Sequence, residues 1–275
     1  GEGSISPPQI GVTAMPRKPQ PIRSDIAWSN RTRIVVRGKS LPDEVIGTLN
    51  LGDFSYLQLT GRMPSPEQSR VFNAILVTLV EHGLTPSAIA ARMTYAGAPE
   101  SMQAAVAAGL CGLGTVFVGS MENAARMLTE ALPDGPAGVD LQATAREVAA
   151  AYAAQKRIVP GMGHPIHKPV DPRAPRLFQV ARECGLAGGY VELVQLIAAE
   201  AERLSGKSLP VNATGAIGAL CCELGFPWRV VRGFGVMARA VGLVGHIMEE
   251  AERPIATEIW LRTEEEAAAH VREPD

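Results

Sequence analysis

The sequence predicts an all-helical protein, and three observations lead to this fold class. Apolar residues make up 46% of the 275-residue chain but aromatic residues only 5%, which favours closely packed helices over a sandwich or barrel. Apolar residues recur at helical spacing, as in Val71, Phe72, Ile75, Leu76 and Leu79. Only one short segment, Arg33 to Gly38, has the β-branched composition of a strand.

Charge and cysteine usage exclude several classes of protein. The 26 Lys and Arg residues balance 28 Asp and Glu residues, so the chain has no broad basic field for nucleic acid. We expect reduced core cysteines, because Cys111, Cys184, Cys221 and Cys222 show no disulfide or metal-ligand spacing. The longest apolar helix, Phe234 to Met248, is interrupted by charge, and no leader opens the sequence. We expect a cytoplasmic protein that binds neither a metal nor a membrane.

The first residues differ in composition from the rest of the chain. Residues 1 to 25 hold five prolines among polar residues, which predicts a flexible arm. The strand Arg33 to Gly38 leads to Pro42 and a predicted helical run from Asp43. Ser65, Pro66 and Gln68 then form a capping box, which begins a helix that ends at His82 and Gly83.

Further helices follow to the end of the chain. Thr85 and Pro86 begin the next helix, and Ser101 to Gly114 is a helix of small residues suited to a crowded core. The remaining predicted helices are 121–132, 140–157, 174–184, 190–204, 211–224 and 227–252. The final glutamate-rich stretch is expected to be a solvated tail or an arm on a partner subunit.

The segment Arg157 to Arg176 is a shaped loop rather than a helix. Five prolines stiffen it, and glycines on both sides of Met162 allow its backbone to approach a ligand closely. His164 follows the second glycine directly. Such a loop can present a histidine rigidly to a substrate, although on these residues alone a tight turn with a structural histidine is the alternative.

This loop resembles the signature of the citrate synthase superfamily. The I-P-G-x-G-H segment corresponds to Ile158 to His164, with Val159 inserted, and the later D-P-R triplet to Asp171, Pro172 and Arg173. The resemblance extends from about Arg33 to Arg253. It implies a citrate synthase-like fold with a large helical domain, 26–120 and 209–275, a smaller one, 121–208, and a homodimer or dimer of dimers.

The resemblance also implies chemistry. The superfamily makes or cleaves the carbon–carbon bond between acetyl-CoA and a keto acid such as oxaloacetate. His164 corresponds to the histidine that faces the keto-acid oxygen, and His82 to a second histidine of the acid pocket. Pro160, Gly161, Met162 and Gly163 would contact coenzyme A, which is a substrate rather than a tightly bound cofactor.

Arginines would hold the carboxylates of the acid. Arg173 corresponds to the arginine of the D-P-R triplet and Arg239 to a second carboxylate ligand. Arg239 lies in an apolar helix, where a guanidinium needs an anion. Arg253 corresponds to an arginine that reaches the neighbouring subunit's site. His246 matches a family histidine but is read as structural.

Two positions depart from the synthase pattern. Phe117 stands where synthases have the histidine that stabilises the enolate, as in the lyase module of ATP-citrate lyase, which the chain resembles better. Thr214 stands where the family has its acid–base aspartate, and a hydroxyl cannot serve as a base near neutral pH. We therefore expect a citryl-CoA lyase-like or citrate synthase-like enzyme. The alternatives are a non-catalytic protein that binds coenzyme A thioesters, a subunit that needs a partner carrying the missing carboxylate, and an enzyme for another acyl-CoA or keto acid.

Overall fold

The computed structural model describes residues 21–163 and 169–272. Its chain divides into two compact units between Leu49 and Asn50, and each unit is described by itself. The predicted division of the helical part into lobes near residues 120 and 209 stays a prediction.

The N-terminal unit contains a small antiparallel sheet with strand order β1-β2-β3. The strands are β1 (Ala27–Ser29), β2 (Ile34–Val36) and β3 (Lys39–Ser40). The predicted strand is therefore confirmed at β2, although Arg37 and Gly38 form the following turn with positive φ angles. The helical run predicted from Asp43 is wrong, because η1 (Leu41–Val45), a short π-helix, ends at once and the first α-helix begins at Leu51.

The second unit starts with helices whose ends are set by local capping. In α1 (Leu51–Thr60), the Asp53 amide donates to the Asn50 side chain. In α2 (Pro66–Val80), the Gln68 amide donates to Ser65 Oγ and the Ser65 amide to Gln68 Oε1, which confirms the predicted capping box. Helix α3 (Pro86–Gly97) has Thr85 at its N-cap, but this side chain makes no capping bond.

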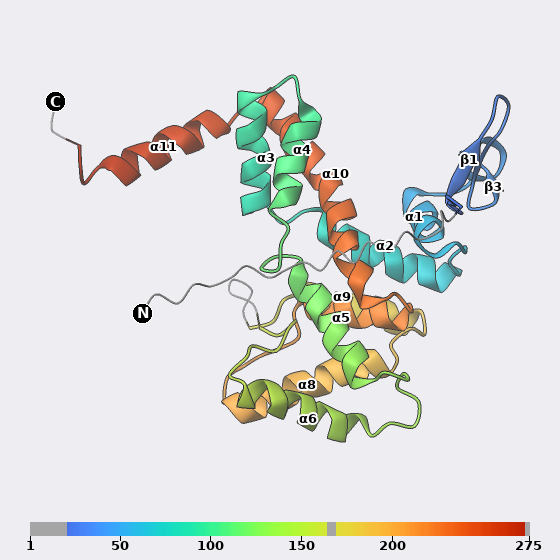
Figure 1. The fold of residues 1–275 in the computed structure, drawn as a ribbon. Coiled ribbons are helices and arrows are strands. Elements are labelled where there is room, and N and C mark those ends of the chain that lie inside the picture. The colour runs from blue at the N-terminus through green and yellow to red at the C-terminus, as the bar shows by residue number, and fades with distance from the viewer. Residues whose placement is uncertain (1–20, 164–168, 273–275) are drawn as a thin grey trace, which may run out of the picture. The chain divides into compact units, whose positions relative to one another are not determined.

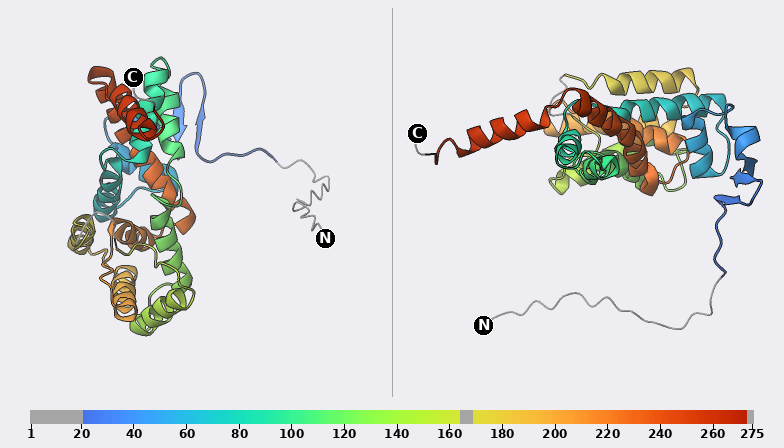
Figure 2. Two further views of the ribbon diagram at one scale, coloured as in Figure 1. Left: turned by 90° about the vertical axis from the view of Figure 1, so that its left-hand side faces the viewer. Right: turned by 90° about the horizontal axis from the view of Figure 1, so that it is seen from above.

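The later helices follow the sequence pattern closely. They are α4 (Met102–Cys111), α5 (Gly119–Ala131), α6 (Leu141–Ala154), α7 (Arg173–Glu183), α8 (Gly189–Ser205), α9 (Ala213–Glu223), η2 (Trp228–Val230), α10 (Val231–Glu252) and α11 (Ala256–Ala268). The stretch expected to be a solvated tail or an arm on a partner subunit forms α11, a mostly exposed helix, and its contact with a partner stays a prediction. It packs mainly on α3 and leads away from the other helices of its unit (Figures 1 and 2).

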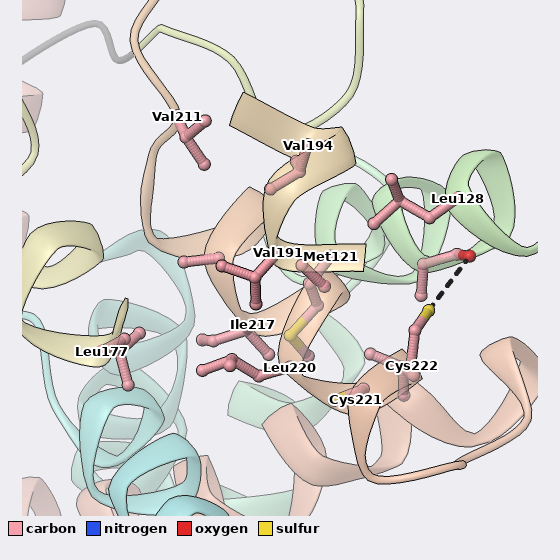
Figure 3. Close-up of a cluster of buried hydrophobic side chains, with 14 of the residues drawn as sticks. Met121, Leu128, Leu177, Val191, Val194, Val211, Ile217, Leu220, Cys221 and Cys222 are labelled. Atoms are coloured by element: carbon pink, nitrogen blue, oxygen red, sulfur yellow. Dashed lines mark hydrogen bonds between the residues drawn. The ribbon is translucent and has the colours of Figure 1, made fainter. Parts of the chain in front are cut away.

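Helix α9 lies at the centre of the main core. It packs against α5, α7 and α8, and α6 packs along α8 (Figure 1). A Cβ on Gly218 would lie 2.8 Å from the Cβ of Ala124, so glycine permits the close crossing of α9 and α5. Figure 3 shows this core with Cys221 and with Cys222, whose thiol donates to the Ala125 carbonyl. These cysteines are buried as predicted, whereas Cys111 is exposed and Cys184 is half-buried.

Helix α10 holds a second group of helices of this unit together. It packs against α2, α3 and α4 (Figure 1). By length and composition, Trp228–Glu252 could cross a membrane, but 44% of its most apolar window is buried within the protein. Buried core helices pass the same test, and the packing of α10 buries part of its apolar surface, including Phe234, Leu243 and Ile247.

Candidate functional site

The predicted glycine loop is attached directly to the start of α9. The Gly163 amide donates to the Pro210 carbonyl (2.8 Å), and the Asn212 amide donates to the Gly161 carbonyl (2.9 Å). Met162 and Val211 therefore form an antiparallel bridge. We call Gly161–Gly163 together with Val211–Gly215 the loop–α9 region.

Two glycines make this attachment possible. Gly161 has a φ angle of +80°, and a Cβ there would lie 2.9 Å from the backbone nitrogen of Gly215 and closer still to its Cα. A Cβ on Gly215 would in turn overlap the carbonyl of Gly161. The two backbones thus touch where side chains would stand, which fixes the path of the loop.

Arg173 is connected to the same region through Asp171. Its Nε and one terminal nitrogen donate to the two carboxylate oxygens of Asp171, each at 2.9 Å. Asp171 is only 1% exposed and also accepts from the Ala213 amide at the start of α9 (2.9 Å). Burial alone would raise the pKa of Asp171, but the hydrogen bonds from Arg173 and Ala213 lower it to about 2.

Thr214 lies in the first turn of α9, next to this ion pair. Its hydroxyl donates to Asn212 Oδ1 (2.7 Å), which also accepts from the Thr214 and Gly215 amides. The Asn212 side-chain nitrogen donates to the Gly163 carbonyl at 2.5 Å. The hydroxyl of Thr214 is thus held by the N-cap of α9, half-buried beside the glycine loop.

Arg239 on α10 holds the segment that carries His82. Its Nε donates to the Leu79 carbonyl (3.3 Å) and a terminal nitrogen to Thr85 Oγ1 (3.2 Å). These two acceptors lie on either side of the turn between α2 and α3, in which His82 is exposed. We call Glu81–Thr85 together with Arg239–His246 the turn–α10 region.

Arg173, which is bound to the loop–α9 region through Asp171, acts electrostatically on Arg239 of the turn–α10 region. Burial lowers the pKa of Arg239, nearby Glu81 raises it, and the positive charge of Arg173 lowers it further. Within the described ranges, 21–163 and 169–272, Arg239 makes no ion pair, since its bonds go to neutral oxygens. The guanidinium groups of Arg173 and Arg239 thus repel each other, and Asp171 pairs with the first of them, which suits a site for a further anion.

A cavity of about 390 Å³ lies beside the glycine loop. Met162 and apolar residues of α6 and α8 line it, among them Ala149, Ala153 and Leu204, and Lys156, Arg157 and Lys207 add positive charge. Lys156 has a φ angle of +52°, a conformation that a side chain disfavours. Residue patterning missed this cavity, because its walls come from separate helices.

Two predicted site residues are not joined to these regions in the described part of the chain, and a third falls outside it. Phe117 lies in the turn before α5 and is 46% exposed. Arg253 follows α10, with its side chain 78% exposed and a 3.8 Å ion pair to Glu249. Because a helix rises about 1.5 Å per residue, it lies roughly 20 Å from Arg239 along α10. His164 lies outside the described residues.

Comparison with known proteins shows the family of this chain. Residues 31–260 match the family model described as citrate synthase, C-terminal domain. The structure of citryl-CoA lyase from Hydrogenobacter thermophilus superposes with a TM-score of 0.76 and 34% identity, over 84% of this chain and 87% of that one.

More distant similarities follow. ATP citrate lyase from Methanothrix soehngenii, solved with citrate and coenzyme A, shares the fold with a TM-score of 0.71 and 21% identity, over 86% of this chain and 40% of that one. Citrate synthase of Deinococcus radiodurans is 24% identical over 91% of this chain. The chain spans 66% of that relative and 39% of the probable ATP-citrate synthase of Dictyostelium discoideum. With the family model matching most of its length, the chain belongs to the citrate synthase family.

Proposed function

We propose that this protein cleaves citryl-CoA to acetyl-CoA and oxaloacetate, or catalyses the reverse reaction. The observation that carries the proposal is the cavity beside Met162, which combines apolar walls with Lys156, Arg157 and Lys207. Coenzyme A pairs an adenine and a pantetheine arm with phosphate groups, so it suits both kinds of wall. The neighbouring Gly161–Gly163 loop borders this cavity through Met162.

The arginines supply the acid end of the proposed site. Asp171 occupies two of the five N–H donors of Arg173, and the other donors remain for a substrate carboxylate. The charge of Arg173 lowers the pKa of Arg239, whose hydrogen-bond acceptors among the described residues are neutral oxygens. A dicarboxylate or tricarboxylate placed between them would relieve the repulsion between the two cations.

In the cleavage direction, a histidine takes the hydroxyl proton of citryl-CoA. The carbon–carbon bond then breaks, its electron pair forms the thioester enolate, and a returned proton gives the methyl group of acetyl-CoA. We assign His164 as the histidine that takes the hydroxyl proton, and we place His82 beside the keto acid. Asp171 is unsuited to protonating or deprotonating the methyl group, because its pKa is about 2 and both of its oxygens are engaged.

Thr214 favours a second candidate function, namely binding of coenzyme A thioesters without efficient turnover. Asn212 orients the hydroxyl of Thr214. A hydroxyl does not exchange a proton with carbon efficiently, as a carboxylate at this position would. We also propose a homodimer, in which the exposed Arg253 serves the neighbouring subunit's site.

The test combines binding with turnover. Calorimetry measures binding of acetyl-CoA and citrate, and citryl-CoA cleavage is followed by reducing the released oxaloacetate with malate dehydrogenase. Cleavage supports the lyase proposal, binding without cleavage supports the binding-protein candidate, and failure to bind acetyl-CoA contradicts both.

The acid end has its own variants. Arg173→Met and Arg239→Met should each weaken citrate binding by about 10-fold to 100-fold, the effect of losing a charged hydrogen bond. Arg262→Met, which removes an exposed arginine paired with Glu258 on α11, is the matched control and should bind citrate normally. Unchanged citrate affinity in both site variants would remove the assignment.

A further inference from the structure

The face of α10 that carries Arg239, Gly242 and His246 contacts the turn between α2 and α3. Arg239, Gly242 and His246 lie three and four residues apart, so they share that face. A Cβ on Gly242 would overlap the Val80 carbonyl and lie 3.1 Å from Glu81 Oε2. Glycine therefore brings the helix close enough for the residues on either side of it to reach the turn.

Glu81 organises this turn with a single carboxylate oxygen. Its Oε1 accepts from the His82 amide (2.9 Å), the Gly83 amide (2.6 Å) and His246 Nε2 (3.0 Å). Burial raises the pKa of Glu81, but the bonds from His246 and the His82 amide more than offset this and lower the pKa below its ordinary value. The carboxylate is thus a charged clamp on the backbone that carries His82.

Arg92 sets the proton position on His246. Its Nε lies 3.1 Å and a terminal nitrogen 3.0 Å from His246 Nδ1. A guanidinium only donates, so Nδ1 must be an unprotonated acceptor. His246 is then neutral, carries its proton on Nε2 and donates it to Glu81.

Arg92 is in turn held in place by acidic residues. It is 1% exposed and pairs with Glu250 (2.8 Å) and with Glu249. Glu250 also accepts from the Ile255 and Ala256 amides at the start of α11. The charged groups around His246 are therefore Arg92 on α3, Glu81 on the turn and the two glutamates on α10.

From this geometry we propose that Glu81, His246 and Arg92 are positioning residues, which hold the His82 turn and Arg239 in place to bind the acid substrate. The inference rests on the proposed function for the identity of that acid. Arg239 bonds on both sides of the turn, at Leu79 and Thr85, so loss of the Glu81 clamp displaces its guanidinium as well as His82. A purely structural role would instead change stability alone.

The experiment uses nitrogen-15 NMR of the full chain and citrate binding. In the wild type, His246 should show the neutral Nε2–H form at pH 7. Glu81→Ala should accelerate exchange of the His82 and Gly83 amides and weaken citrate binding, each about 10-fold, as expected for a lost bond to a charged group. Glu81→Gln keeps an acceptor oxygen and should restore most of the amide protection.

Glu258→Gln is the control, since this glutamate is exposed on α11 and pairs only locally with Arg262. It should change neither amide exchange nor binding. An Nδ1–H form or a protonated ring on His246, or unchanged His82 and Gly83 exchange in Glu81→Ala, would overturn the inference whether or not citrate binds. If wild type binds citrate, equal affinity in Glu81→Ala would also overturn it. Absence of citrate binding in wild type would count against the proposed function, and the NMR results would still decide the positioning roles.

Discussion

The loop–α9 region and the turn–α10 region are built by different interactions. In the first, glycine backbones touch and amides bond to carbonyls, as at Gly161 and Gly215. In the second, charged and polar side chains connect helices, as at Glu81, His246 and Arg239. Close backbone packing therefore holds the proposed coenzyme A end of the site. Hydrogen bonds from charged side chains hold the turn at its proposed acid end. Substitutions should therefore affect them in different ways.

The largest expected effect is on steric fit. Gly161→Ala should lower the free energy of unfolding by about 2 to 5 kcal/mol, which combines the strain of a positive φ with overlap against Gly215. Gly163→Ala is the matched control. It also has a positive φ, but among the described residues its Cβ would meet Leu209 alone, at 3.5 Å, so it should lose about 1 to 2 kcal/mol. Urea unfolding measures both, and equal losses would show that the Gly161–Gly215 contact is not restrictive.

The second-largest effect is expected when a carboxylate is introduced into the loop–α9 region. Thr214→Asp should increase turnover about 100-fold, the lower end of what a general acid–base group contributes. Thr214→Asn has similar size without the charge and should give no increase. Deuterium wash-in at the acetyl-CoA methyl group, with saturating oxaloacetate, measures the rate. If the Asp and Asn variants exchange equally slowly while binding normally, Thr214 does not occupy the position of the acid–base aspartate.

The buried carboxylate of Asp171, paired with Arg173, supports the loop–α9 region, so acid should weaken that region. Its pKa of about 2 lies below the ordinary value of 3.8, so its stabilisation is complete above about pH 5 and is lost as the pH falls toward 2. The difference in unfolding free energy between wild type and Asp171→Asn should shrink by about 2 kcal/mol over this range. Asp134→Asn, at an exposed turn residue, is the control. A difference that stays constant with pH would contradict the assigned ion pair.

The smallest effect separates stability from binding at one residue. Lys156 ends α6 with a φ angle of +52°, where glycine is preferred. Lys156→Gly should therefore stabilise the fold by about 1 kcal/mol while it weakens acetyl-CoA binding several-fold, by about the same energy. Lys156→Ala keeps the strain and should weaken binding without the gain in stability. Thermal unfolding and calorimetry test this, and unchanged acetyl-CoA affinity would remove Lys156 from the site.

Local signals explain why most of the fold could be predicted from sequence. The capping box at Ser65 and the apolar spacing of α2 both lie within a few residues, and the structure confirms them. Helix α11 was missed because its exposed surface gives a weak apolar pattern and its first amides bond to Glu250 rather than to a residue beside them. The exposure of Cys111 likewise depends on packing that residue type does not reveal.

The site was predictable only where a motif marked it. The structure joins the glycine loop, Arg173 and Thr214 through the start of α9, and their roles in a site stay predictions. The role of Asp171 as the partner of Arg173, and that of Glu81 as a clamp, could not be read from sequence. Glu81 and His246 lie 165 positions apart, and no local pattern links such residues.

The same separation has a consequence for how the protein forms during synthesis. The loop–α9 region needs contacts between residues about 50 positions apart, so it can assemble once the ribosome has released α9. The turn–α10 region must wait for α10, because the bonds of Arg239 and His246 span 154 to 165 positions. Closing such long loops is entropically costly, and domains form progressively as the chain emerges. The loop–α9 region therefore matures first, and a nascent chain that stops before α10 lacks Arg239 and His246, and with them the interactions that hold the His82 turn.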